Sequence, residues 1–240
     1  MMNKEIDTTN YKKSITYALI IIVAWFIVHV FSVFIHSLSN PLWLTALLIL
    51  LQSWLYAGMF IVAHDAMHGT LCPKNIKLND AIGGFIVFIY AGFEWEKMRS
   101  SHHEHHIHSG TNKDPDYYSE NSQNFLSWYI NFFSNYFKLK QFFLMVVFTL
   151  VYILILGAEY ENTIVMWAIP AILSSFQLFY FGTYLTHRNS KPFKDKHNAR
   201  TNEFPFWLSL VTCFHFGYHH EHHLYPHEPW WRLPARKLNQ

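Results

Sequence analysis

Two short stretches of the chain concentrate imidazole side chains. Five histidines lie between His102 and His108, in the sequence SSHHEHHIHSG, and a second run, YHHEHHLYPHE, begins at Tyr218. Near neutral pH a histidine can be a general base, a pH switch or a metal ligand. The spacing of these residues distinguishes between the three roles.

The histidines recur at spacings that place them on one face of a helix. His64 and His68 are four residues apart, and the motif HxxHH occurs twice, at 102–106 and at 219–223. Residues three or four positions apart lie on the same side of a helix. With a further histidine at the end of an apolar segment, the candidate metal ligands are His64, His68, His102, His105, His106, His187, His219, His222 and His223.

Nine imidazoles close to long apolar segments favour metal binding. Without a metal ion, their ring nitrogens would be left unpaired next to a medium of low dielectric, which is costly. Nine nitrogens exceed the coordination of one ion, so we predict two ions with four or five ligands each. The two cysteines, Cys72 and Cys213, form no CxxC motif, which argues against thiolate zinc and iron–sulfur centres. Imidazole suits zinc, copper, iron and nickel. The HExxH spacing of zinc proteases is absent.

Carboxylates close to these histidines are candidates to orient them, because a ligating imidazole usually donates its other N–H to an acid or a carbonyl. Asp65 and Asp116 rank first as catalytic candidates, since they lie inside or directly after a histidine motif. Asp114, Asp195 and Glu221 are further possibilities. The remaining cytoplasmic-side histidines are interpreted as structural or supporting residues: His103, His108, His197, His215, His220 and His227. His215 is the least clear of these, because it lies four residues before His219.

The composition indicates a membrane protein. Of 240 residues, 51% are hydrophobic and 14% are charged, whereas a soluble domain carries roughly 25% charged residues. The net charge of +2 gives no indication of nucleic acid as a partner. The first apolar run is too long for a signal-peptide core and lacks a small-residue cleavage site, so we interpret it as a retained membrane helix.

Four apolar segments are long enough to cross a bilayer, which takes about 20 residues of helix. They cover residues 15–36, 41–63, 141–157 and 163–186, and Pro170 is expected to kink the last of them. The apolar segment 81–93 is shorter and is predicted to be interfacial or re-entrant. We therefore predict an all-α integral membrane fold, with residues 1–240 as one domain: four transmembrane helices as two hairpins, plus interfacial helices.

The positive charges predict the orientation of the hairpins. The loops at 36–41 and 157–163 contain no lysine or arginine, and all 18 basic residues lie in 1–14, 69–140 and 187–240. By the positive-inside rule, both termini are expected in the cytoplasm.

This topology brings the histidine motifs to one membrane face. Of 17 histidines, only His29 and His36 fall on the other half of the molecule. The expected result is a cytoplasmic, histidine-rich cap that holds two metal ions.

The chain resembles a known family in the segments that surround these motifs. AHDAMHGT, HHIHSGTNKDPDY, HNAR and TCFHFGYHHEHHLYPHEPWWRLP resemble the integral-membrane fatty-acid desaturase and hydroxylase superfamily, and within it the bacterial-type beta-carotene ketolases (carotenoid 4,4'-oxygenases). The resemblance extends from about residue 60 to 235. DPDY and HHLYPHEPWWRLP are its most specific parts. Thr186 departs from the family pattern, which usually has a proline before the helix-end histidine.

The resemblance implies a non-haem di-iron oxidoreductase that uses O₂ as co-substrate. It would oxidise the C4 methylene of the ring of beta-carotene, with zeaxanthin as a second candidate substrate, to a ketone by two successive hydroxylations. The products would be echinenone and canthaxanthin, or astaxanthin-type ketones. The carotenoid would come from the lipid phase of a bacterial inner membrane, and electrons from an external donor such as ferredoxin, because no flavin, nicotinamide or cytochrome motif is present.

Two other functions remain open from the residues alone. A carotenoid hydroxylase or a lipid desaturase of the same superfamily would need the same metal site and a different pocket. A metal transporter would need polar residues near the midplane of several spans. The span interiors here contain only scattered Ser, Thr and Gln with His29, which argues against transport.

Overall fold

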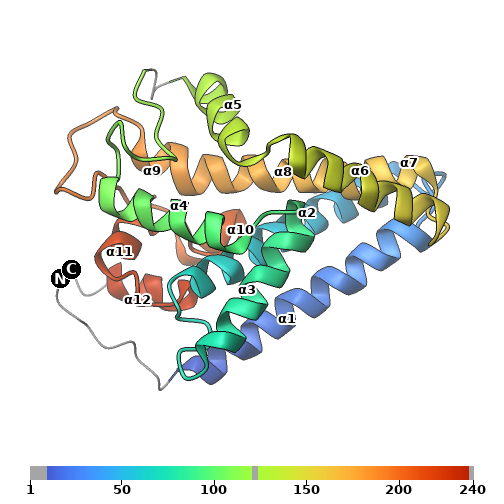
Figure 1. The fold of residues 1–240 in the computed structure, drawn as a ribbon, viewed down its shortest axis with the longest axis horizontal. Helices are drawn as coiled ribbons and strands as arrows, with labels where there is room; N and C mark the ends of the chain where they lie inside the picture. The colour runs from blue at the N-terminus through green and yellow to red at the C-terminus, as the bar shows by residue number, and fades with distance from the viewer. Residues whose placement is uncertain (1–9, 121–123, 238–240) are drawn as a thin grey trace.

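The structure, a computed structural model, describes residues 10–120 and 124–237 (Figure 1). Residues 1–9, which belong to the predicted cationic segment 1–14, lie outside the described residues. The described part is built from helices and loops, with one isolated β-bridge between Thr201 and Tyr218. The prediction of an all-α fold is confirmed.

Three helices are long and apolar enough to cross a membrane. The first combines α1 (Tyr11–Val30) with the π-helical turn η1 (Phe31–Ile35), and the second is α2 (Leu42–Met67). The third is a composite helix, Tyr160–His187. Its parts are α7 (Tyr160–Thr163), η2 (Ile164–Ala168), α8 (Ile169–Leu178), η3 (Phe179–Tyr184) and α9 (Leu185–His187). These helices correspond to the segments predicted at 15–36, 41–63 and 163–186.

Pro170 does not break the composite helix. A proline removes one backbone donor and crowds the preceding turn. The helix accommodates this with the π-helical segment η2, which ends two residues before the proline, and then continues as α8. The helix is thus locally widened directly before the proline at which the sequence predicts a kink.

Two pairs of shorter helices are sharply bent. α3 (Ile76–Ala91) meets α4 (Trp95–His108) at 98°, and α5 (Phe125–Tyr136) meets α6 (Leu139–Leu154) at 77°. At 1.5 Å per residue α6 is about 24 Å long, less than the roughly 30 Å of a bilayer core. The chain thus has three spanning helices, or up to five if each bent pair also crosses. The predicted span 141–157 is present only as part of such a pair.

The two bends are fastened to each other. Gly92 closes α3 in the left-handed conformation, with φ of 68°, and its carbonyl accepts a hydrogen bond from Gln141 Nε2 at 3.4 Å. The Lys140 ammonium donates to the Glu94 carboxylate across the same junction. These contacts hold the start of α4, and with it the HxxHH motif at 102–106, against the start of α6.

α2 lies at the centre of the bundle, packed against α1, α3 and α8 (Figure 1). Its side chains Tyr56, Met59 and Ile61 are almost completely buried. α1, in contrast, exposes large apolar side chains such as Ile20 and Phe26. An apolar surface of this kind is typical of a helix in contact with lipid.

The C-terminal elements gather at the end of α2, beside α4 (Figure 1). They are α10 (Phe206–Cys213), α11 (His219–Leu224), η4 (Trp230–Arg232) and α12 (Leu233–Lys237). Phe214 and His215 have positive φ angles of 46° and 61°, a conformation that non-glycine residues rarely adopt. They reverse the chain between α10 and α11, which brings the HxxHH motif at 219–223 toward the one at 102–106.

Candidate metal centre

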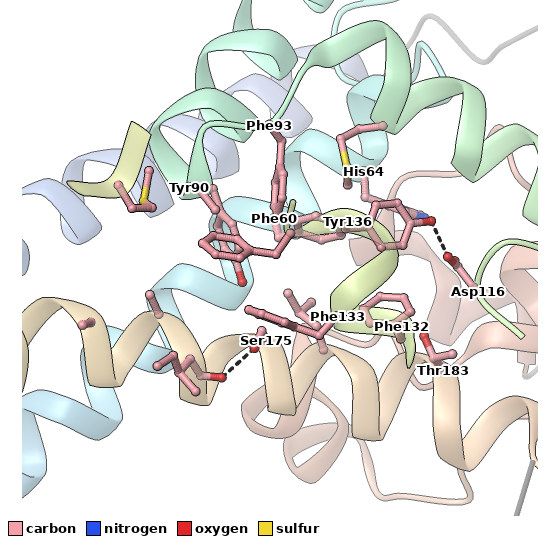
Figure 2. A pocket seen from close by; sticks show the side chains of 18 of the residues that line it. Phe60, His64, Tyr90, Phe93, Asp116, Phe132, Phe133, Tyr136, Ser175 and Thr183 are labelled. Carbon is pink, nitrogen blue, oxygen red and sulfur yellow. Dashed lines mark hydrogen bonds between the residues drawn. The ribbon is translucent and has the colours of Figure 1, made fainter. Parts of the chain in front are cut away.

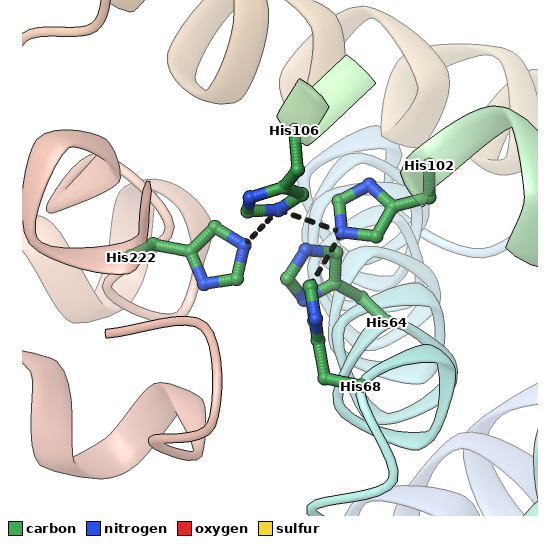
Figure 3. Close-up of side chains that lie close together, drawn as sticks. All are labelled: His64, His68, His102, His106 and His222. Atoms are coloured by element: carbon green, nitrogen blue, oxygen red, sulfur yellow. Dashed lines mark hydrogen bonds between the residues drawn. The ribbon is translucent and has the colours of Figure 1, made fainter. Parts of the chain in front are cut away.

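Five histidines form a first group at the end of α2 (Figure 3). His64 comes from α2 and His68 caps its C-terminal end, while His102 and His106 come from α4 and His222 from α11. One ring nitrogen from each lies within 4.8 Å of all the others. The Nε2 atoms of His68 and His102 are 2.6 Å apart, and those of His106 and His222 are 2.9 Å apart.

Four further histidines form a second group under the same criterion. His105 lies on α4, His187 ends α9, and His219 and His223 lie on α11. The Nε2 atom of His223 is 3.2 Å from that of His105 and 3.2 Å from that of His219. All four side chains are buried, whereas three members of the first group are only partly buried. The two groups together contain the nine histidines that the sequence singles out.

Each HxxHH motif contributes to both groups. On α4, His102 and His106 face the first group while His105 faces the second. On α11, His222 faces the first group, and His219 and His223 face the second. Consecutive helical residues point about 100° apart, so one short helix can serve two neighbouring centres. α4 and α11 are thereby fixed relative to each other.

The hydrogen bonds of two rings show where their lone pairs point. His187 Nδ1 donates to the Asn198 carbonyl at 2.7 Å, and His105 Nδ1 donates to the Asp114 carboxylate at 2.9 Å. A neutral ring that donates through Nδ1 carries its lone pair on Nε2. His187 Nε2 is buried without a partner among the described residues, and so is His64 Nε2. Lone pairs that converge in this way repel each other unless a cation lies between them, so both groups fit metal ions.

The protonation state of α11 also suits metal binding. Burial, reinforced by the neighbouring imidazoles, lowers the pKa of His219, His222 and His223 well below the usual value. These rings are therefore neutral at pH 7, which is the form that coordinates a metal.

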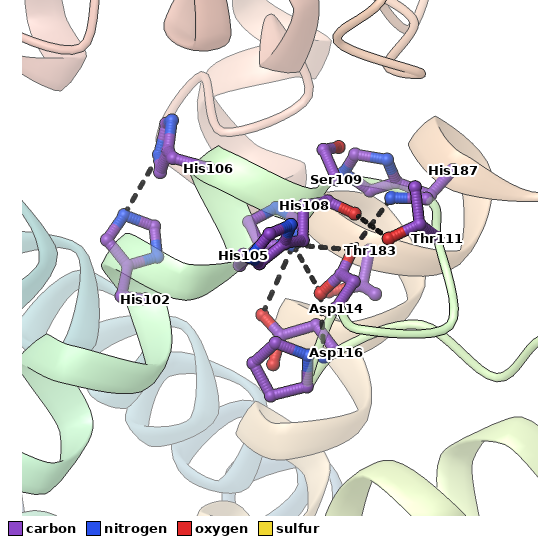
Figure 4. A network of polar contacts seen from close by, with 12 residues as sticks. His102, His105, His106, His108, Ser109, Thr111, Asp114, Asp116, Thr183 and His187 are labelled. Carbon is purple, nitrogen blue, oxygen red and sulfur yellow. Dashed lines mark hydrogen bonds and ion pairs between the residues drawn. The ribbon is translucent and has the colours of Figure 1, made fainter.

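Asp114, and not Asp116, makes the closest carboxylate contact with a histidine of the two groups (Figure 4). Both Asp114 oxygens lie within hydrogen-bond distance of His105 Nδ1, at 2.9 and 3.0 Å, whereas the closest Asp116 oxygen is 3.8 Å away. Asp114 also accepts the backbone N–H groups of Gly110 and Asp116. The expected order of the two acids is wrong, because the turn at Pro115 folds the first carboxylate back onto its own loop.

Asp116 instead lies beside the cavity described below, where it accepts a hydrogen bond from the Tyr136 hydroxyl. Burial raises the pKa of Asp116, and the charge of Asp114 adds to this, although His105 opposes both. Burial also acts on Asp114, but His105 outweighs it and lowers the pKa of that carboxyl. The two acids therefore differ in proton affinity, with Asp114 losing its proton at a lower pH than Asp116.

Asp65, the other acid that the sequence ranks first, contacts the C-terminal segment. Its carboxylate oxygens accept the backbone N–H of Trp230 at 3.2 and 3.3 Å. The nearest imidazole nitrogen, His64 Nδ1, is 4.0 Å away. In this structure Asp65 positions the segment that follows α11 and does not hydrogen-bond a ring of either group.

The other histidines near this end have partners outside the two groups. His103 Nε2 lies 3.0 Å from the Met67 carbonyl at the end of α2, and His220 Nε2 lies 2.8 Å from Asp195 Oδ2. His215, four residues before His219, packs against the rings of Phe206 and Trp230 instead. The ambiguity within residues 102–106 is thus resolved in space, with His103 pointing away from both groups.

An apolar cavity of about 450 Å³ begins at the histidines and extends along the composite helix (Figure 2). His64, His105 and His219 line one end, and Ile164 and Trp167 line the other. Between them the wall consists mostly of aromatic and aliphatic side chains, including Phe60, Tyr90, Phe93, Phe132, Phe133, Tyr136, Met145 and Leu178. From Ile164 to Thr183 the helix rises about 28 Å at 1.5 Å per residue. The cavity is therefore shaped for a long, apolar molecule.

Comparison with known proteins identifies the class. The family model of fatty acid desaturases matches residues 41–160 and 137–238. The chain therefore belongs to the fatty acid desaturase family. With its long apolar helices it is an integral membrane protein.

The names of similar proteins describe a more specific activity than the family model does. The chain is 44% identical over 220 residues to a "Beta-carotene ketolase" of Paracoccus sp. (strain PC1), covering 90% of this chain and 89% of that protein. It is 40% identical over 209 residues to a "Beta-carotene 4-ketolase 3" of Haematococcus lacustris, covering 84% and 64%. It is 38% identical over 185 residues to a "Zeaxanthin 4-ketolase" of Chlamydomonas reinhardtii, covering 75% and 41%. The family resemblance inferred from the motifs is confirmed.

Proposed function

We propose that this chain is a beta-carotene 4-ketolase, a membrane oxidoreductase that converts the ring C4 methylene to a ketone with O₂. The observation that carries the proposal is the position of the two histidine groups at one end of a long apolar cavity. The names of the similar relatives agree with it. A metal site that opens into such a cavity suits a substrate that stays in the lipid phase.

The nine imidazoles are proposed to hold two iron ions, five ligands for one and four for the other. The first set is His64, His68, His102, His106 and His222, and the second is His105, His187, His219 and His223. An unactivated C–H bond offers no handle for acid–base attack, so a redox metal has to supply the oxidant. Iron bound at these positions would supply that oxidising power from O₂.

The surrounding residues position the ligands and the substrate. Asp114 holds His105 in the tautomer that presents Nε2 to the second group, and the Asn198 carbonyl does the same for His187. Asp65 ties the segment after α11 to α2, and so aligns two helices that carry ligands. Asp116 and Tyr136 share a hydrogen bond at the cavity wall, and the pKa of Asp116, raised by burial to about 6, lets this carboxyl exchange a proton near neutral pH. The aromatic wall excludes water from the reacting ring.

The membrane arrangement is part of the proposal. The three long helices and the α5–α6 pair make four spans in two hairpins, with α3 and α4 interfacial or re-entrant. The absence of lysine and arginine from 36–41 and 157–163 supports cytoplasmic termini and a cytoplasmic metal cap. Residues 1–240 would act as one domain in a bacterial inner membrane, with electrons from an external donor such as ferredoxin.

Expression in a host that makes beta-carotene and has no ketolase of its own tests the function directly. The 4-keto products echinenone and canthaxanthin should accumulate with the parent chain and be absent with His105→Ala. Ring alcohols without ketones would identify a carotenoid hydroxylase instead. Unchanged beta-carotene beside altered membrane fatty acids would identify a lipid desaturase.

A further inference from the structure

The cavity wall next to the second histidine group carries one hydroxyl with no assigned role. Thr183 is buried and lines the cavity together with His105, Asp116 and His219. Figure 2 shows it at the same end of the cavity as Asp116 and Phe132. Thr183 therefore lies where the apolar wall of the cavity meets the polar groups of the metal centre.

The helix is distorted where it presents this threonine. Thr183 belongs to η3, the π-helical segment Phe179–Tyr184, which directly precedes the turn that ends at His187. π-helical turns inside long helices often occur at functional sites, because the widened turn redirects side chains. Thr186, three residues later, donates its hydroxyl to the Gly182 carbonyl in the ordinary manner of a helical threonine. The Thr183 hydroxyl makes no hydrogen bond to any described residue.

The other polar groups at this end of the cavity belong to the imidazoles and to the Asp116–Tyr136 pair. Those of the imidazoles belong to the two groups, and the Asp116 carboxylate accepts the Tyr136 hydroxyl. Farther along the wall, Ser175 donates to the Ile172 carbonyl and is paired with Tyr129. Among the described hydroxyls beside the metal centre, that of Tyr136 is paired with Asp116, whereas that of Thr183 is left for a ligand.

We propose that Thr183 recognises a hydroxyl on ring carbon 3 of the substrate, next to the carbon that is oxidised, so that the chain prefers 3-hydroxylated rings to plain ones. This inference rests on the proposed ketolase function. The relatives include enzymes named for beta-carotene and one named for zeaxanthin, so their names leave the choice between the two kinds of ring open. A ring hydroxyl buried in an apolar cavity without a partner is unfavourable, and Thr183 would supply that partner.

A carotene that carries a 3-hydroxyl on one ring only provides the test. Both rings of this molecule compete for the same active site, so differences in expression, folding or electron supply cancel in the product ratio. The parent should place the new ketone mainly on the hydroxylated ring. Thr183→Val, which keeps the shape and removes the hydroxyl, should shift the ratio about three- to tenfold toward the plain ring, the effect of one neutral hydrogen bond.

Two variants serve as controls. Thr149→Val removes another hydroxyl of the same cavity without a partner among the described residues, on α6 one turn before Tyr152, which stacks on Trp167 at the far end. It should leave the ratio unchanged. Thr183→Ser keeps the hydroxyl and should keep the parent's preference, and Thr183→Ala replaces the valine variant if that does not accumulate.

Several results would overturn the assignment. An unchanged product ratio in Thr183→Val and Thr183→Ala would show that the Thr183 hydroxyl does not recognise the ring hydroxyl. An equal shift in Thr149→Val would assign the preference to general polarity of the cavity. Accumulation of 4-hydroxy products in Thr183→Val would mean that Thr183 retains the reaction intermediate instead. A parent chain that makes no ketone from beta-carotene would refute the ketolase function itself, which is a separate outcome.

Discussion

Histidines occupy both ends of the helical bundle, and their ring nitrogens have opposite surroundings. At the far end, His29 lies between the Tyr152 hydroxyl and the Gln52 amide, each 3.0 Å away, and His36 Nε2 lies 2.9 Å from the Thr45 hydroxyl. At the metal end, the Nε2 atoms face one another or have no partner. The rings at the far end find hydrogen-bond partners within the protein. The nine rings of the two histidine groups instead need a cation between their nitrogens.

This difference separates a structural histidine from a ligand without reference to sequence motifs. Buried polar atoms are normally paired, so convergent unpaired nitrogens indicate something that binds there. The two kinds of histidine should accordingly respond differently to substitution, and the following predictions are ordered by the size of the expected effect.

Loss of any metal-end imidazole should have the largest effect. We expect alanine at any one of the nine positions to lower both iron content and ketone formation to near background: His64, His68, His102, His105, His106, His187, His219, His222 and His223. His36→Ala is the matched control at the far end and should keep nearly full iron and activity. Iron analysis of the purified variants and pigment chromatography measure the two effects. Full activity in one of the nine would remove that residue from the ligand set.

Asp114→Asn should have the next largest effect. The amide preserves the shape but presents a weaker acceptor to His105, so the ring is held less firmly in its metal-binding tautomer. Carboxylates in this position typically contribute 10–100-fold to metal affinity or activity. Asp195→Asn is the control, because Asp195 pairs with His220, which belongs to neither group. Chelator titration of iron retention would refute the assignment if the two variants behaved alike.

The sequence predicts the type of site better than its details. The spacing of His64 and His68 places both rings on one face only if the helix continues beyond residue 63, and α2 does continue to Met67. The division of the ligands between two groups depends on how α11 approaches α4. That approach is set by the reversal at Phe214 and His215, whose positive φ angles have no signature in non-glycine residues. No proline or glycine lies at the bend after Tyr136, so the sequence does not indicate this bend either.

The different roles of Asp114 and Asp116, in contrast, could have been predicted, because the sequence contains a turn signal at Asp114-Pro115. An aspartate directly before a proline is typical of the first position of a turn, where its carboxylate accepts the N–H two residues later. Asp114 does this to Asp116 at 2.9 Å, and the same geometry brings its oxygens to His105. The turn chemistry thus predicts Asp114, which is also two residues nearer than Asp116 to the histidines at 102–108.

Substitution of His29 should reduce stability without affecting the metal. His29→Ala leaves the buried Gln52 and Tyr152 groups without their shared partner, which costs about 1–3 kcal/mol for each unsatisfied group. We expect a lower unfolding temperature in detergent and unchanged iron per folded chain. A loss of iron equal to that of His105→Ala would contradict the distinction between the two ends.

The smallest effect concerns pH and the metal-free protein. The pKa values of His219, His222 and His223 are lowered in the folded state. Below the unfolded value of about 6.5, the unfolded chain therefore binds more protons than the folded one, and stability falls with pH. The unfolding temperature of the metal-free chain should be lower at roughly pH 5.5 than at roughly pH 7.5. His222→Gln should reduce this difference, and an unchanged difference would assign it to other groups.

The metal content of the purified chain tests the central claim most directly. Elemental analysis of protein prepared anaerobically with iron, combined with Mössbauer spectroscopy, counts the ions and reports their ligands. Two groups of imidazoles predict about two iron atoms per chain in nitrogen-rich surroundings. A single ion per chain after full loading, or stoichiometric zinc that supports full ketone formation, would contradict the account.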